Sequence, residues 1–174
     1  MRAKTLYVDG YNILENWKSL EEARKVSLEE AREKLVDLLQ EYISYSGWKV
    51  VLVFDAYNLK GVENIEHRGK LTVVYTKERE TADSYIERMV ANYEGKDEII
   101  VATSDALEQI TILGGGATRM SAPELEARLT EAHKMYRLRR KRAHLPFEEK
   151  ILDEDLADAL IANLKEREDH RKTP

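Results

Sequence analysis

The sequence has no cysteine among its 174 residues, which excludes disulfide bonds and thiolate metal ligands. It also has no apolar run near the roughly 20 residues of a transmembrane helix, so we expect no membrane-spanning segment. The first ten residues, MRAKTLYVDG, lack the apolar stretch of a signal peptide, and a cytoplasmic protein is expected. The four histidines are scattered without metal-ligand spacing, which argues against a zinc site or a histidine general base.

What the sequence does have is charge: 35% of its residues are charged, and its mean hydropathy is -0.56. The hydrophobic share of 43% is still enough for one domain with a real core. We expect this domain to span residues 1–145, with a helical C-terminal tail over residues 146–174. The net charge of -5 argues weakly against nucleic-acid binding, but it says nothing about where the charges lie.

Short β-branched apolar runs alternate with segments of helical spacing. The runs predict three buried strands and two weaker ones, at Thr5–Val8, Val50–Phe54, Ile99–Ala102, Leu71–Tyr75 and Thr118–Met120. Continuously apolar strands separated by helices are typical of a parallel sheet that is covered on both faces. We therefore expect an α/β fold with a central, mostly parallel sheet of four to five strands.

Capping signals place the helices between these strands. Serine followed three residues later by glutamate predicts helix starts at Ser27 and Ser121, the first helix ending near Gly47 and the second near Arg142. Helical spacing predicts two more helices, over Glu80–Tyr93 and over Ser104–Leu113. The segment Asn58–Lys70 is expected to be a loop that lies near the substrate.

Carboxylates follow three of the predicted strands, in LYVD, VLVFD and IIVATSD. Asp9, Asp55 and Asp105 should therefore meet at the carboxyl edge of the sheet, where ligands bind in open α/β folds. Asp83, in the first turn of a predicted helix, adds a fourth, and Asn12 adds a neutral oxygen beside Asp9. Close like charges repel unless a cation neutralises them, and oxygen ligands suit Mg²⁺ or Mn²⁺.

A structural role explains each of these aspartates equally well when it is taken alone. Aspartate after a strand is a common helix cap or turn former, and an acid in a first helical turn is favoured by the helix dipole. Their shared position at one edge is what favours a site.

The segments YVDGYNIL, VLVFDAY, ERETADSYIE and VATSDALEQ, in this order, resemble the YacP-like branch of the NYN ribonuclease domains, relatives of the PIN-domain nucleases. The resemblance covers roughly Lys4 to Leu145. It implies a Rossmann-like, three-layer PIN fold and a metal-dependent endoribonuclease that acts on mRNA in association with the ribosome. It also implies a metal-binding core of three aspartates and two supporting residues, namely Asp9, Asp83 and Asp105 with Asn12 and Asp55.

A basic segment, HKMYRLRRKRAH, carries six Lys or Arg residues between His133 and His144 of an otherwise acidic chain. The alternative is that the segment is only a solvated helix end, but such an end needs one or two cations rather than six. We therefore favour binding to RNA or to the ribosome. The predicted contacts are Lys134, Arg137, Arg139, Arg140, Lys141 and Arg142.

Three function classes could account for some or all of these features. An endoribonuclease that uses Mg²⁺ or Mn²⁺ and acts on RNA, with no role for DNA or membranes, explains both the acidic and the basic residues. A non-catalytic RNA- or ribosome-binding adaptor of the same fold remains the alternative, although it needs none of the aspartates. A haloacid-dehalogenase phosphatase would need a second aspartate two residues after Asp9, and Tyr11 stands there.

Overall fold

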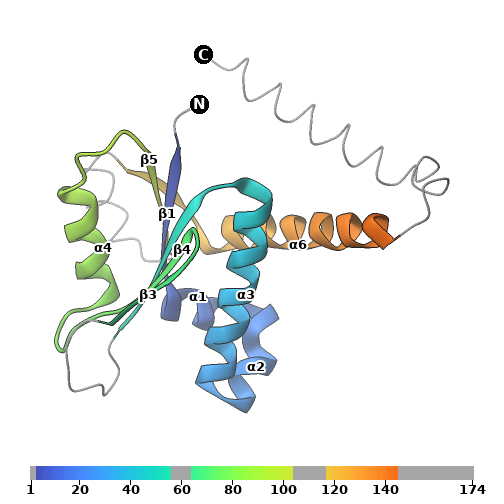
Figure 1. Cartoon of the computed structure of the whole chain (residues 1–174). Coiled ribbons are helices and arrows are strands. Elements are labelled where there is room, and N and C mark those ends of the chain that lie inside the picture. Colours follow the sequence, from blue (N-terminus) through green and yellow to red (C-terminus); the bar gives the residue numbers. More distant parts are fainter. Residues whose placement is uncertain (1–2, 56–63, 104–116, 145–174) are drawn as a thin grey trace. The chain divides into compact units, whose positions relative to one another are not determined.

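The structure is a computed structural model that describes residues 3–55, 64–103 and 117–144, without the side chains of 141–144 (Figure 1). The chain divides into two compact units, residues 1–132 and 133–174. The predicted short helix Ser104–Leu113 and the predicted tail from residue 146 lie outside the described residues, so the boundary at residue 145 stays a prediction.

A six-stranded sheet forms the centre of the first unit, with the strand order β3-β4-β2-β1-β5-β6. All neighbouring strands run parallel except the pair of β3 and β4. The strands are β1 (Lys4–Asp9), β2 (Lys49–Phe54), β3 (Asn64–Arg68), β4 (Leu71–Tyr75), β5 (Glu98–Ala102) and β6 (Thr118–Met120). The predicted α/β fold with a mostly parallel sheet is confirmed, and each predicted strand is present.

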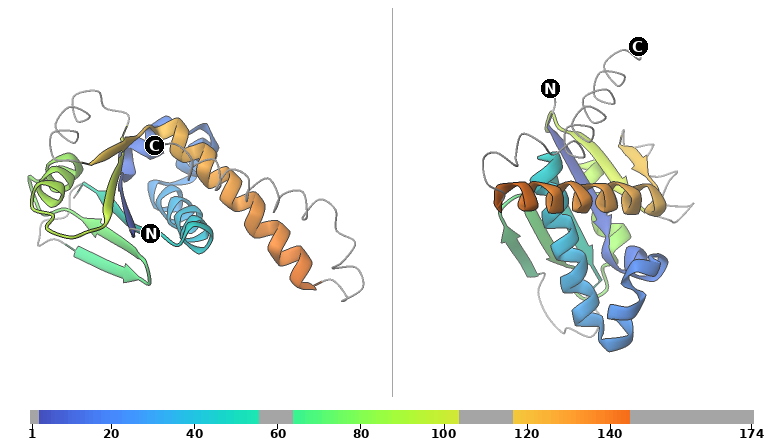
Figure 2. Two further views of the ribbon diagram at one scale, coloured as in Figure 1. Left: turned by 90° about the horizontal axis from the view of Figure 1, so that it is seen from above. Right: turned by 90° about the vertical axis from the view of Figure 1, so that its right-hand side faces the viewer.

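Helices cover both faces of this sheet (Figures 1 and 2). On one face lie α1 (Gly10–Asn16), α2 (Glu21–Val26), α3 (Leu28–Ser46) and the beginning of α6 (Ala122–His144), packed in one apolar cluster with Leu6, Leu52 and Ile100. On the other face, α4 (Ala82–Ala91) packs on a second cluster that contains Tyr7, Val53 and Val101. Alternate residues of the inner strands thus enter opposite cores, which is why these strands are apolar throughout.

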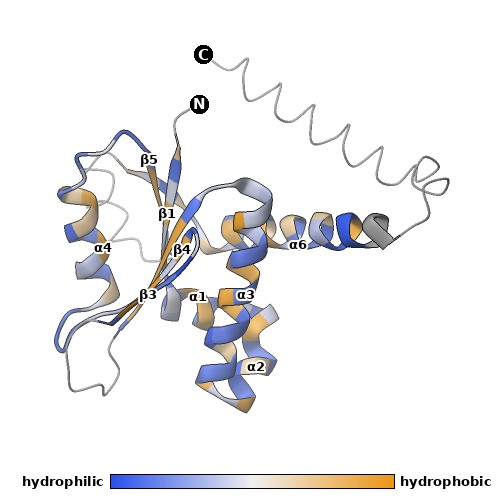
Figure 3. Cartoon of the chain, in the orientation of Figure 1, coloured by the Kyte–Doolittle hydropathy of each residue, from blue (hydrophilic) through white to orange (hydrophobic). Residues whose placement is uncertain are grey.

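The capping predictions explain where the long helices begin and end. The Ser27 hydroxyl accepts from the Glu30 amide, and Gly47 ends α3 in the left-handed conformation, at φ 74°. At the start of α6, Glu124 accepts from the Ser121 amide while Ser121 Oγ accepts from the Glu124 amide. Figure 3 shows apolar and polar stretches alternating along the helices, a pattern typical of helices with one buried face.

Two predictions of local structure were wrong. The segment expected to be a loop contains strand β3, an exposed edge strand held by antiparallel pairing with β4. The sheet therefore has six strands rather than four to five. Between β1 and α3 the chain also forms α1, α2 and a short 3-10 helix (Lys18–Leu20), which are too short to show a helical repeat in the sequence. None of the described helices is long and apolar enough to cross a membrane.

Candidate active site

Asp9 is both the last residue of β1 and the N-cap of α1. One of its carboxylate oxygens accepts a hydrogen bond from the Asn12 amide, at 3.0 Å. Asp9 is therefore a helix cap, as its position after a strand suggested, and this hydrogen bond holds Asn12 beside Asp9 in the first turn of α1. The residue is only 9% exposed, which is unusual for a carboxylate that has no basic partner in the described structure.

Asp55 follows directly after β2, the parallel neighbour of β1. Its Oδ1 accepts a hydrogen bond from the amide of Ala82, the first residue of α4. This contact fixes the N-terminus of α4 at the carboxyl edge of the sheet, where β1 and β2 both end (Figure 1).

Asp83 occupies the first turn of α4, and this placement brings it into hydrogen-bonding contact with Asp9. Asp9 also experiences the charge of Asp55. The structure thus brings together three of the four predicted aspartates from β1, β2 and α4. The fourth, Asp105, lies outside the described residues.

A braced turn positions Asp83. The Thr76 hydroxyl donates to the Glu80 carbonyl at 2.6 Å, and the largely buried Glu80 carboxylate pairs with Arg88 of α4 at 2.8 Å. Within the same turn Arg79 adopts a positive φ of 69°, a conformation that costs energy in a residue with a Cβ. These contacts hold the turn in one shape and so fix the start of α4.

Burial and repulsion change the protonation of this cluster. Desolvation, followed by the hydrogen bond and charge of Asp83 and the charge of Asp55, raises the pKa of Asp9 to about 7, although the Asn12 amide lowers it. Burial likewise raises the pKa of Asp55, with a smaller contribution from Asp83, against the lowering effect of the Ala82 amide. No basic side chain among the described residues appears among the groups that lower either pKa.

The chemistry of this donor set fits a hard divalent cation, which would relieve the repulsion that raises the Asp9 pKa. In the described part of the chain, however, no group of three or more Asp, Glu, His or Cys side chains converges closely enough to hold a metal by itself. Asp9 and Asp83 therefore supply part of a coordination shell, and the third predicted ligand, Asp105, belongs to a segment outside the described residues.

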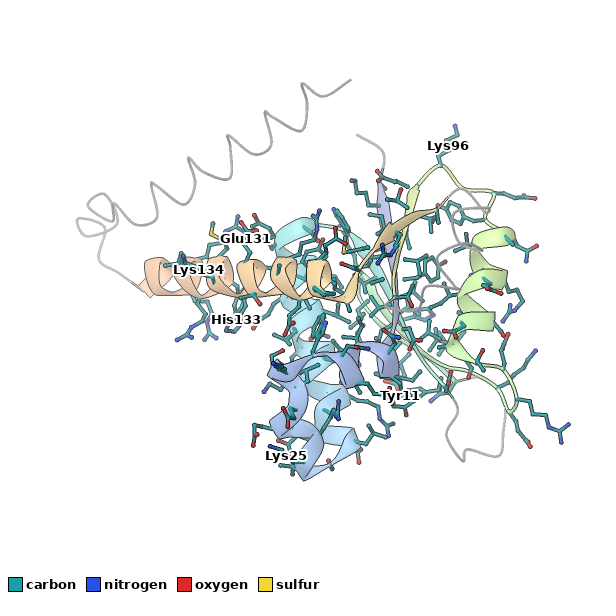
Figure 4. All side chains as sticks on the ribbon, turned by 180° about the vertical axis from the view of Figure 1, so that it is seen from behind. Tyr11, Lys25, Lys96, Glu131, His133 and Lys134 are labelled. Atoms are coloured by element: carbon teal, nitrogen blue, oxygen red, sulfur yellow. The ribbon has the colours of Figure 1, made fainter. Side chains whose placement is uncertain are left out.

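Aromatic rings border the acidic cluster, and their packing around Phe54 is not evident from local sequence alone. Phe54 is fully buried and contacts Tyr11 at 5.1 Å and Tyr75 at 5.6 Å between ring centroids. Figure 4 shows Tyr11 where α1 leaves the strand ends. Arg32, from α3, lies 5.9 Å from the centroids of both Tyr11 and Phe54. Phe54 directly precedes Asp55 and Tyr11 lies two residues after Asp9 in the chain, but only the tertiary structure brings Arg32 to these rings.

The basic segment is helical, as predicted, and forms the end of α6 in the second unit. The side chains of Lys134, Arg137, Arg139 and Arg140 are exposed, and the Arg140 guanidinium lies 5.9 Å from the Tyr136 ring centroid. Lys141 and Arg142 continue the helix, but their side chains are outside the described part.

Comparison with known proteins agrees with the motifs. The family model of the YacP-like NYN domain matches residues 6–169. The protein YacP of Bacillus subtilis is 45% identical over 121 residues, which cover 69% of this chain and 71% of YacP. Two crystal structures of B. subtilis Rae1 (YacP), the protein and a point mutant, both superpose with a TM-score of 0.68. They are 35% and 36% identical, and the matches cover 98% and 91% of this chain and 99% of each Rae1 chain.

Proposed function

The chain belongs to the YacP-like NYN family, and from this premise we propose that it is a metal-dependent endoribonuclease that cleaves mRNA in association with the ribosome. Membership of the family and the superposition on Rae1 make the fold that of a nuclease-type domain. The single observation that carries the proposal further is the cluster of Asp9, Asp55 and Asp83 at the edge where parallel strands end. A protein that only bound RNA would gain nothing from burying mutually repelling carboxylates there.

Each residue of the cluster has a distinct part in this reaction. Asp9 and Asp83, with Asp105, would hold Mg²⁺ or Mn²⁺ through carboxylate oxygens. A cation bound there supplies the activation of water and the neutralisation of phosphate charge that phosphodiester hydrolysis needs. Asp55 keeps α4, and hence Asp83, in place through the Ala82 amide, and Asn12 lies beside Asp9 as a neutral polar group.

Attack by water rather than by the ribose hydroxyl would leave a 5′ phosphate and a 3′ hydroxyl. The exposed cations of α6 would bind RNA phosphates or ribosomal RNA without reading sequence. This division of work, with acidic residues for the chemistry and basic residues for binding, accounts for both charged features of the chain, and a cytoplasmic location would follow from it.

The test is a comparison of the wild type with Asp83→Asn. Both proteins are titrated with Mg²⁺ and Mn²⁺ while thermal melting is recorded, and both are then given labelled mRNA with and without ribosomes. We expect the metal to raise the Tm of the wild type and to support cleavage, and both responses to be lost in the variant. Asp37→Asn, the same change at an exposed position of α3, serves as the control and should behave as the wild type.

Cleavage by Asp83→Asn at the wild-type rate would contradict the assignment of the site. Tight binding of RNA or ribosomes by the wild type, without a metal response and without cleavage, would instead favour the adaptor function.

A further inference from the structure

Arg32 stands out among the cations near the active site because, in the described part of the chain, it has aromatic neighbours but no acidic partner. It lies in the second turn of α3, where its guanidinium is 5.9 Å from the ring centroids of both Tyr11 and Phe54. No ion pair or hydrogen bond of its side chain to another described residue is found. Its Nε is buried and has no hydrogen-bond partner. An added ligand would therefore bind to the two terminal nitrogens of the guanidinium.

The two rings connect Arg32 to the acidic cluster. Tyr11 lies two residues after Asp9, and Phe54 directly precedes Asp55. Arg32 is therefore held at the same edge of the sheet as the aspartates, on the side of α1 and α3. It is not their counter-ion, however, because its charge is not among the influences on the protonation of Asp9 or Asp55.

We propose that Arg32 binds an RNA phosphate next to the one that is cleaved. The rings of Tyr11 and Phe54 would orient its guanidinium toward the RNA. A guanidinium that lies over aromatic rings is restricted in orientation and partly desolvated, and its two terminal nitrogens match two phosphate oxygens. A buried, unpaired Nε raises the energy of this arrangement, and an added anion close to the terminal nitrogens offsets that cost through its charge.

The inference rests on the proposed function, since it takes RNA to be the substrate. It goes beyond that function by naming a contact outside the acidic cluster and outside the basic segment of α6. The simpler alternative is that Arg32 only covers the Phe54 ring with its aliphatic stem.

The test compares Arg32→Gln and Arg32→Lys with the wild type, using the full chain and a labelled single-stranded RNA. Affinity is measured over a range of salt concentrations, and KM and kcat are measured for cleavage. We expect Arg32→Gln to weaken binding about tenfold, to raise KM more than it lowers kcat, and to reduce the salt slope by about 0.7. Arg32→Lys keeps the charge and the aliphatic chain but lacks the planar guanidinium with its two terminal nitrogens. This variant should therefore show the wild-type salt slope but only part of the wild-type affinity.

Arg128→Gln is the matched control, because Arg128 also lies over an aromatic ring, 6.0 Å from the centroid of Trp48. Trp48 precedes β2 and so lies at the opposite edge of the sheet. This variant should bind RNA as the wild type does. Melting of each variant separates loss of folding from loss of binding, and Arg32→Lys remains informative if Arg32→Gln is poorly folded.

The outcomes separate this inference from the proposed function. Cleavage by Arg32→Gln with unchanged KM, affinity and salt slope would overturn the role of Arg32 and leave the nuclease in place. Binding that depends on Arg32 in a wild type that never cleaves would support Arg32 and contradict the nuclease. A wild type that binds no RNA would overturn both.

Discussion

Replacing Asp9 with asparagine should stabilise the metal-free protein, even though it removes a group that we place in the catalytic centre. Asparagine has the same shape, and its side-chain oxygen can still cap α1 by accepting from the Asn12 amide. What the substitution removes is the charge, which is buried, close to Asp83 and Asp55, and unpaired with a cation in the described structure.

The expected gain in the free energy of unfolding of Asp9→Asn follows from the raised pKa of Asp9. The pKa rises from 3.8, the value expected in the unfolded chain, to about 7 in the folded protein. This difference of about 3 units, at 1.36 kcal/mol per unit, sets an upper limit of about 4 kcal/mol. Because local relaxation reduces such penalties, we expect about 2–4 kcal/mol.

The direction in which folding stability changes with pH follows from proton binding by Asp9. Between pH 4 and 7 the folded protein keeps the Asp9 proton while the unfolded chain releases it, so folding stability falls as the pH rises through this range. Below pH 4 both states are protonated and the full stability is present; above about pH 7 both are ionised and the loss is complete. The free energy of unfolding of Asp9→Asn should lack this component, so its advantage over the wild type should grow from pH 4 to pH 7 and then level off.

The assay is urea unfolding of both proteins in EDTA at several pH values between 4 and 8. Asp37→Asn, with the same change at an exposed position, should show no such pH-dependent gain. If the difference in unfolding free energy between wild type and Asp9→Asn does not change with pH, or if the wild type is the more stable protein at pH 8, the electrostatic description of the site is wrong. Adding Mg²⁺ at ten times its dissociation constant should return about 1.4 kcal/mol to the wild type and nothing to the variant.

Two further predictions concern other parts of the chain. Reversing the charges of Arg139 and Arg140 to glutamate should weaken RNA or ribosome binding and flatten its salt dependence without changing Tm, and unchanged binding would make this helix end a solvated surface only. A Cβ on Gly10 would lie 2.2 Å from Cε1 of the fully buried Phe54, so Gly10→Ala should lower the free energy of unfolding by about 1–3 kcal/mol and reduce cleavage by displacing Asp55. In the matched change at Gly47 the new Cβ meets no atom within 4 Å, so only the positive φ is strained and the loss should be about 1 kcal/mol with cleavage unaffected.

Much of the fold could be predicted because its signals are local. The parallel strands are apolar at every position, as strands buried on both faces must be, and capping residues such as Ser27 and Ser121 mark helix starts. Strand β3 was missed because it is exposed and polar, and only its antiparallel pairing with β4 makes it a strand. The short helices after Asp9 were missed because six or seven residues contain too few turns for a helical repeat.

The sequence by itself determined which carboxylates end up together. Parallel strands all end at one edge, so the aspartate that ends β1 and the one that follows β2 had to become neighbours once the fold was known to be parallel. The first turn of a helix was likewise a reliable place for Asp83.

Only the tertiary structure decided what state these residues are in and what surrounds them. The raised pKa of Asp9 depends on burial and on the approach of Asp83, which lies 74 positions further along the chain, and neither is a property of local sequence. The position of Arg32 over Tyr11 and Phe54 depends in the same way on how α3 packs against α1 and β2. Local sequence selects strands, caps and turns, whereas desolvation and charge proximity arise only when distant segments pack together.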